Sequence, residues 1–114
     1  MKIAFVASEN VIVNSEDAKH YARFADEIIL NDASCIDFYT AEHIKREGVK
    51  ITEFTPDYEK YGKAAPKKIV DLAERVIVFF DGASAQTRAV IEYATEQGKP
   101  PEIVFYPLVL KLRF

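Results

Sequence analysis

Small polar side chains follow three apolar runs of this chain, and these are the residues whose types and spacing suit ligand binding. They are grouped as Ser8-Glu9-Asn10, Asn31-Asp32-Ala33-Ser34 and Asp81-Gly82-Ala83-Ser84. Two of the groups lead directly into predicted helices, whose first N–H groups have no internal acceptor and attract anions. The pattern therefore indicates a site for a phosphate-bearing ligand, such as a nucleotide or a nucleotide derivative.

The strongest of these signals is the segment from Asp81 to Arg88. Gly82 permits a tight turn or a close backbone approach, and Ser84 could cap a helix or donate its hydroxyl group to a phosphate. Thr87 should face the strand ends, and Arg88 could supply a bidentate phosphate contact. An ordinary capped turn with a surface arginine explains the same residues equally well.

Other chemically active residues give weaker indications. Asp37 opens a helix predicted over residues 36–47, where it could bind a ribose hydroxyl or act as a general base. A first-turn acid that complements the helix dipole is the favoured interpretation. Cys35 is expected to be a small buried thiol rather than a nucleophile. His20 and His43 lack the spacing of a metal site, so we predict no metal, no cofactor and no complete catalytic constellation.

Length and composition limit the class of protein. The 114 residues fit one domain, residues 1–114, and the net charge of -3 argues against a nucleic-acid partner. A single cysteine cannot build a disulfide framework, which favours an intracellular protein. No apolar run approaches the ~20 residues needed to cross a bilayer. We therefore expect a cytoplasmic protein that binds a small molecule and has no membrane partner.

The elements that must position these residues alternate between two patterns. Strands are predicted over residues 2–7, 27–30, 49–54, 75–80 and 103–106, and helices near 15–25, 36–47, 66–73 and 85–97, with a long loop at 55–63. Residues 109–114 could add a sixth strand or pack against the body. The alternation predicts an α/β fold, a three-layer α/β/α Rossmann-like domain with a parallel sheet in the order 3-2-1-4-5. Its ligand crevice should lie at the carboxyl ends of strands one and four.

Three segments also carry a family resemblance: Asn31–Asp37, Tyr61–Ala65 and Asp81–Thr87. Over residues 26–106 their order and spacing resemble the SLOG superfamily of small Rossmann-like proteins, and are most similar to the DUF2493 (YspA-like) type. The resemblance implies a nucleotide-derived ligand held by these turns. It would place Ser84 and Thr87 near a phosphate and Asp37 near a ribose.

The chain also departs from that family's pattern. Asn31, Asp32 and Cys35 replace the glycines of the first turn, and Gln86 replaces a glycine of the last. Each added side chain narrows the space for a phosphate, and Asp32 adds a negative charge. Val90 stands where the phosphoribohydrolase branch has its glutamate, so hydrolase activity does not carry over.

Three functions compete on this basis. The first is a binding or sensor domain for a nucleotide-like molecule, which we rank first. The second is an enzyme that cleaves an N-glycosidic bond, of the deoxyribosyltransferase or phosphoribohydrolase type, with Glu9, Asp32, Asp37 and Asp81 as candidate carboxylates. The third is a degenerate, non-catalytic interaction module that forms a homodimer or docks a partner, with Tyr106–Leu110 as a candidate apolar patch.

Overall fold

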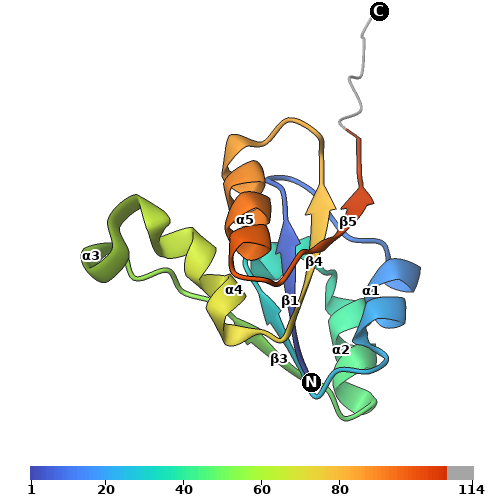
Figure 1. The fold of residues 1–114 in the computed structure, drawn as a ribbon. Helices are drawn as coiled ribbons and strands as arrows, with labels where there is room; N and C mark the ends of the chain where they lie inside the picture. The colour runs from blue at the N-terminus through green and yellow to red at the C-terminus, as the bar shows by residue number, and fades with distance from the viewer. Residues whose placement is uncertain (108–114) are drawn as a thin grey trace, which may run out of the picture.

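The computed structural model describes residues 1–107, in which strands and helices alternate along the chain (Figure 1). The strands are β1 (Lys2–Ala7), β2 (Glu27–Leu30), β3 (Lys50–Glu53), β4 (Arg75–Phe80) and β5 (Glu102–Phe105). The longer helices are α1 (Ser15–Ala22), α2 (Phe38–Arg46) and α5 (Ala85–Glu96). All strand pairs are parallel and the order is β3-β2-β1-β4-β5, so the predicted fold class and strand order are confirmed.

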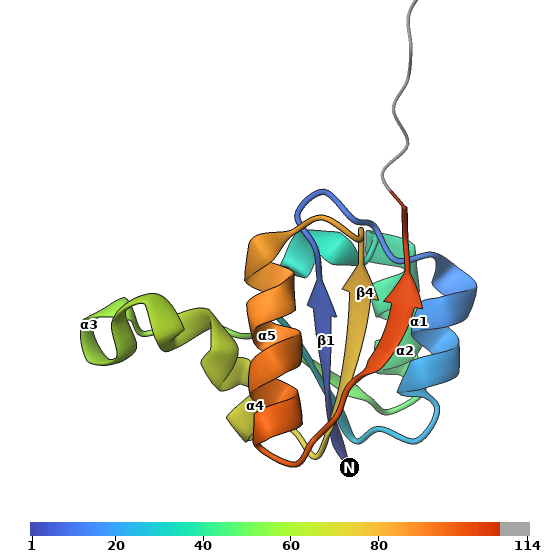
Figure 2. The same ribbon diagram turned by 45° about the horizontal axis from the view of Figure 1, so that its top comes forward.

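The core consists of two apolar layers, one on each face of the sheet. Helices α1 and α2 cover one face, and α5 with the short helix α4 (Ile69–Leu72) covers the other (Figure 2). Side chains alternate along β1, so Ile3 and Phe5 pack toward α1 and α2, while Ala4 and Val6 pack toward α4 and α5. Burial on both faces explains why the central strands are continuous apolar runs.

Helix starts are fixed by side-chain caps. Asn14, Asp37 and Ser84 each accept a hydrogen bond from the backbone N–H three residues later, at 2.8, 2.9 and 3.3 Å. Such a cap satisfies a first-turn N–H that has no acceptor inside the helix, and typically contributes about 1 kcal/mol. The chain therefore enters α1, α2 and α5 at defined residues.

Residues 55–68 differ from the prediction of a loop followed by a helix start. They form α3 (Tyr58–Tyr61) and a 3₁₀ helix (Gly62–Lys68) that leads into α4. Asp57 caps α3 by accepting from the Lys60 N–H at 3.1 Å. Pro66 lies inside the 3₁₀ helix, and because proline has no N–H it prevents a continuous α-helix through this segment. Figure 1 shows α3 projecting away from the sheet.

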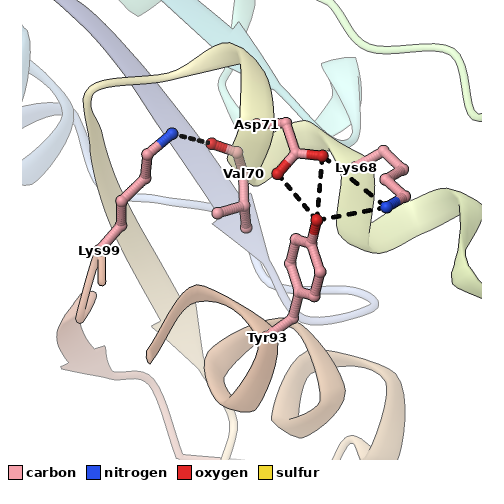
Figure 3. Close-up of polar contacts among 5 residues, drawn as sticks. All are labelled: Lys68, Val70, Asp71, Tyr93 and Lys99. Carbon is pink, nitrogen blue, oxygen red and sulfur yellow. Dashed lines mark hydrogen bonds and ion pairs between the residues drawn. The ribbon is translucent and has the colours of Figure 1, made fainter. Parts of the chain in front are cut away.

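Polar contacts join α4 to α5 (Figure 3). The Tyr93 hydroxyl donates to the Asp71 carboxylate at 2.8 Å and accepts from Lys68 Nζ at 3.3 Å. Lys99 Nζ donates to two backbone carbonyls at the end of α4, that of Val70 at 3.0 Å and that of Ala73 at 2.9 Å. Because the last carbonyls of a helix lack internal donors, Lys99 serves as their cap.

Two sequence predictions concern membranes and the last residues. Within residues 1–107, no helix combines the length and the apolar composition that crossing a bilayer requires. The strand considered for residues 109–114 lies outside the described residues.

Candidate functional site

A crevice of about 290 Å³ lies at the carboxyl ends of β1, β2 and β3, beside the first turn of α5. Its walls are Val6, Ala7, Glu9, Asn31, Asp32, Glu53, Phe54, Pro56, Tyr58, Pro66, Ser84, Gln86, Thr87 and Val90. The crevice was predicted between β1 and β4; its lining includes the end of β1 and the start of α5, which follows β4, and it extends to the ends of β2 and β3. Asp81 in the turn after β4 accepts from the N–H groups of Ala83 and Ser84, and Ser84 is the residue of that turn that lines the crevice, next to α5.

The structure brings part of the predicted site together. Five of the predicted residues line the crevice: Glu9, Asn31, Asp32, Ser84 and Thr87. Six do not: Ser8, Ser34, Asp37, Asp81, Gly82 and Arg88. The reasons differ, and each follows from the hydrogen bonds that these residues make.

A chain of hydroxyl groups runs beneath the crevice. Ser8 Oγ accepts the Asp81 backbone N–H at 3.2 Å and lies 2.9 Å from Thr87 Oγ1. The Thr87 hydroxyl donates to Ser84 Oγ at 3.0 Å, so the proton between Ser8 and Thr87 comes from Ser8. Ser84 Oγ also accepts the Thr87 N–H, so its own proton is left to donate toward the crevice. Both predicted roles of Ser84 are thus open, because it caps α5 and still offers a donor.

Asn31 joins β1 to the turn that follows β2. Its Oδ1 accepts from the Ala7 N–H and its Nδ2 donates to the Ala7 carbonyl, both at 2.9 Å. The side-chain amide thereby takes the place of a backbone pair where the two strands separate. One N–H and one lone pair of Asn31 remain for a ligand.

Asp32 and Ser34 form a local turn at the start of a short 3₁₀ helix (Ala33–Cys35). Asp32 Oδ1 accepts from the Ser34 hydroxyl at 2.6 Å and from the Ser34 N–H at 2.9 Å. These two bonds, the hydroxyl first, hold the pKa of Asp32 below its usual value. Asp32 is therefore a carboxylate at neutral pH. The Ser34 hydroxyl donates its proton to Asp32 and so does not donate it to a ligand.

Asp81, Gly82 and Arg88 were predicted to bind the ligand, but they do not line the crevice. Asp81 Oδ1 accepts from the N–H groups of Ala83 and Ser84, both at 2.8 Å, and these bonds lower the pKa of Asp81. Arg88 donates to the Gly82 carbonyl at 2.9 Å instead of pointing to a phosphate site. Gly82 has φ +86°, which confirms the tight turn.

Asp37 and Cys35 have structural roles. Asp37 is exposed and accepts from both the backbone N–H and the hydroxyl of Thr40, at 2.9 and 2.8 Å, which lowers the pKa of Asp37. Asp37 therefore caps α2 and lies outside the crevice, where it is not placed to bind a ribose hydroxyl or act as a general base. Burial raises the pKa of the Cys35 thiol to about 12, as expected of an inert thiol.

The crevice is acidic and partly aromatic. Its charged residues are Glu9, Asp32 and Glu53, and none of its lining residues is a lysine, arginine or histidine. Phe54 and Tyr58 provide aromatic surface. Tyr58 was considered as a side chain that could stack on a base or cover the core, whereas Glu53 and Phe54 were missed, although the predicted strand 49–54 has its carboxyl end at the same edge of the sheet. Repulsion from the carboxylates disfavours a phosphate here.

A second, larger cavity of about 550 Å³ lies between α1 and α2. It is lined by His20, Lys19, Arg23, His43 and other side chains of both charge signs. It lies away from the carboxyl ends of the strands, where parallel sheets present ligand sites. We therefore assign the candidate site to the smaller crevice.

Within residues 1–107 no three histidine, cysteine, aspartate or glutamate side chains are grouped closely enough to hold a metal ion. Among protein-family models, curated proteins and solved structures, none matches this chain. The resemblance to the SLOG superfamily thus stays a prediction.

Proposed function

We propose that this domain binds a nucleotide-derived small molecule in the crevice and that the sugar and base supply most of the recognition. The observation that carries the proposal is the lining of the crevice. Among the described residues it combines three carboxylates, two aromatic side chains and a hydroxyl donor, and no cationic side chain.

Each part of a nucleoside has a complementary group in this lining. Carboxylates accept hydrogen bonds only, and ribose hydroxyl groups are donors that suit Glu9 and Glu53. A base can stack on Phe54 or Tyr58, a contact that is typically worth about 1–3 kcal/mol. The free proton of Ser84 suits a carbonyl or ring nitrogen. The first N–H groups of α5 are backbone donors at this wall that could meet a phosphate.

The experiment is a thermal-shift comparison of nucleosides with their monophosphates at equal concentration. A ligand at about 100 times its dissociation constant adds about 2.7 kcal/mol, which moves the melting temperature by several degrees. We expect the larger shift from the unphosphorylated member of a pair. If no nucleoside or monophosphate raises the melting temperature of a folded sample, the proposal is refuted.

Glu9→Gln and Glu53→Gln are the variants to use with this screen, because both side chains are exposed. Each should reduce the nucleoside shift and improve binding of the monophosphate. Glu96→Gln, at the far end of α5, is the matched control and should leave both shifts unchanged. Ser84→Ala and Thr87→Ala are poor tests, because those residues cap α5 and support its turn.

Cleavage of the N-glycosidic bond is a second candidate, favoured by the presence of three carboxylates in one crevice. The low pKa of Asp32 suits it to stabilise a cationic sugar rather than to protonate a leaving base. The test is chromatographic detection of free base after incubation with nucleosides. Binding without base release would support the binding domain and reject the enzyme.

A further inference from the structure

The larger cavity, of about 550 Å³, lies between α1 and α2 and takes no part in the function proposed above. The two helices lie side by side over one face of the sheet (Figure 2). Ala25 and Val49, which line the cavity, come just before β2 and β3. The cavity is therefore at the amino ends of these strands, opposite the crevice. Its volume is typical of a site for a small organic molecule.

The inner wall of the cavity is apolar. It consists of Ala22 at the end of α1, Ile44 of α2, and the two residues that precede the strands, Ala25 and Val49. All four are buried residues of the core on this face of the sheet. An apolar group of a ligand would be removed from water against this wall, which favours binding.

Two cations line the cavity from α1. Lys19 and Arg23 are four residues apart, so they lie one turn from each other on the same face of the helix. Among the residues that the structure describes, neither forms an ion pair. Like charges at this spacing destabilise a helix. An anion bound between them would remove that repulsion.

The usual role of cations at a helix end is carried out here by the backbone. Such cations bond to the last carbonyl groups of the helix, as Lys99 does for α4. At the end of α1, the N–H groups of following residues already donate to the carbonyls of His20 and Ala22. Capping therefore does not explain why Lys19 and Arg23 line the cavity.

Two histidines add further donors. His20 comes from α1 and His43 from α2, so both helices place an imidazole on the cavity. An imidazole has at least one N–H that can donate to an anionic oxygen. The acidic lining residues are less close to the two cations. Glu47 Oε1 lies 3.9 Å from His43 Nε2, and Glu16 belongs to the first turn of α1, at the opposite end of the helix from Arg23.

We propose that this cavity is a second ligand site, which binds a small organic anion with an apolar body. Lys19 and Arg23 bind the acidic group through charge-assisted hydrogen bonds, and the apolar body lies on the inner wall. Carboxylates, phosphates and sulfonates share the required chemistry. The acidic crevice disfavours such ligands, so the two ends of the sheet select molecules of different charge.

The test is a fluorescence titration with two dyes that share the same aromatic rings. Anilinonaphthalene sulfonate carries a negative charge, and phenylnaphthylamine carries none. We expect the sulfonate to bind about tenfold more tightly, because two cationic donors meet its acidic group. Equal affinities for the two dyes, or no binding of the sulfonate, would overturn the proposal.

Lys19→Gln combined with Arg23→Gln should raise the dissociation constant of the sulfonate by about tenfold and leave that of the neutral dye unchanged. Lys45→Gln combined with Arg46→Gln is the matched control, since it removes the same two charges from α2 outside the cavity, and all four side chains are exposed. A control that weakens binding equally overturns the proposal, because net charge or partial unfolding would then explain the dye binding.

Phenyl phosphate and benzoate are then added as competitors of the bound sulfonate dye. Displacement by either one supports the proposal, and the stronger competitor shows whether the cavity prefers a phosphate or a carboxylate. If neither competitor displaces the dye, the site does not recognise an anionic group on a small apolar body, and the proposal is overturned.

Discussion

The contact between Gly82 and Phe105 gives a prediction that can be worked out from the structure. A Cβ atom added at Gly82 would lie 2.8 Å from Phe105 Cε2, which is closer than carbon atoms approach. Gly82 also has φ +86°, a conformation that side chains other than glycine rarely adopt. Gly82→Ala therefore carries two costs, a backbone cost and a steric cost.

Gly48 separates the two costs. Its φ is +87°, but a Cβ added there meets nothing within 4 Å. The left-handed conformation costs about 1–2 kcal/mol, partly offset by about 0.4–1 kcal/mol from the lower entropy of the unfolded chain, and this balance is common to both positions. The crowding at Gly82 adds about 1–2 kcal/mol, toward the low end of overpacking because the Phe105 side chain is 63% exposed and can shift.

The assay is urea unfolding of Gly82→Ala and Gly48→Ala at one protein concentration. With an m-value of about 2 kcal/mol/M, Gly82→Ala should unfold about 0.5–1 M urea earlier than Gly48→Ala. In a Phe105→Ala background the two substitutions should cost the same, because the ring is absent. Equal midpoints with Phe105 present would refute the reasoning, since they would mean that the ring does not lie on Gly82.

Three further predictions concern stability and reactivity. Lys99→Met should lower the free energy of unfolding by about 1–2 kcal/mol in urea melts, because hydrogen bonds from a charged donor to two carbonyls are lost, whereas exposed Lys63→Met should change little. The free energy of unfolding should be constant near neutral pH and fall as the pH drops below about 4. The reason is that the pKa values of Asp32 and Asp81 are lowered below 3.8 in the folded chain, and protonation weakens the hydrogen bonds that these carboxylates accept. Urea midpoints measured from pH 7 to pH 2.5 check this, and a midpoint that rises on acidification would contradict it. Iodoacetamide should label Cys35 at pH 8 far more slowly in the native than in the unfolded chain, because its pKa is about 12 and it is buried; comparable rates would show that the thiol is accessible.

The fold could be predicted from the sequence because its signals are local and repeat along the chain. Apolar runs such as 75–80 identify buried strands, and their alternation with helices restricts the sheet to parallel pairing. Residues 55–68 could not be predicted in the same way. A cap at Asp57 and a proline at position 66 shape short helices that have no apolar periodicity.

The site was only partly predictable, because each of its polar residues has several possible hydrogen-bond partners and the sequence does not show which of them it contacts. Asp37 and Arg88 are residue types that suit a ligand site, but each is hydrogen-bonded within the protein. Asp37 accepts from the neighbouring Thr40 hydroxyl, and Arg88 donates to the Gly82 carbonyl. Glu53 was missed because it belongs to an edge strand whose end reaches the crevice only through the topology of the sheet.

The Phe105 ring on Gly82 has a thermodynamic consequence for the molecule as a whole. The ring belongs to the edge strand, and the glycine belongs to the turn that leads into the crevice wall, so the two regions share one packing contact. A change at the β5 edge that shifts the Phe105 ring therefore also changes the free energy of the Gly82 turn, and linkage requires a change in that turn to alter the packing of the ring by the same free energy. Any such coupling should vanish in Phe105→Ala.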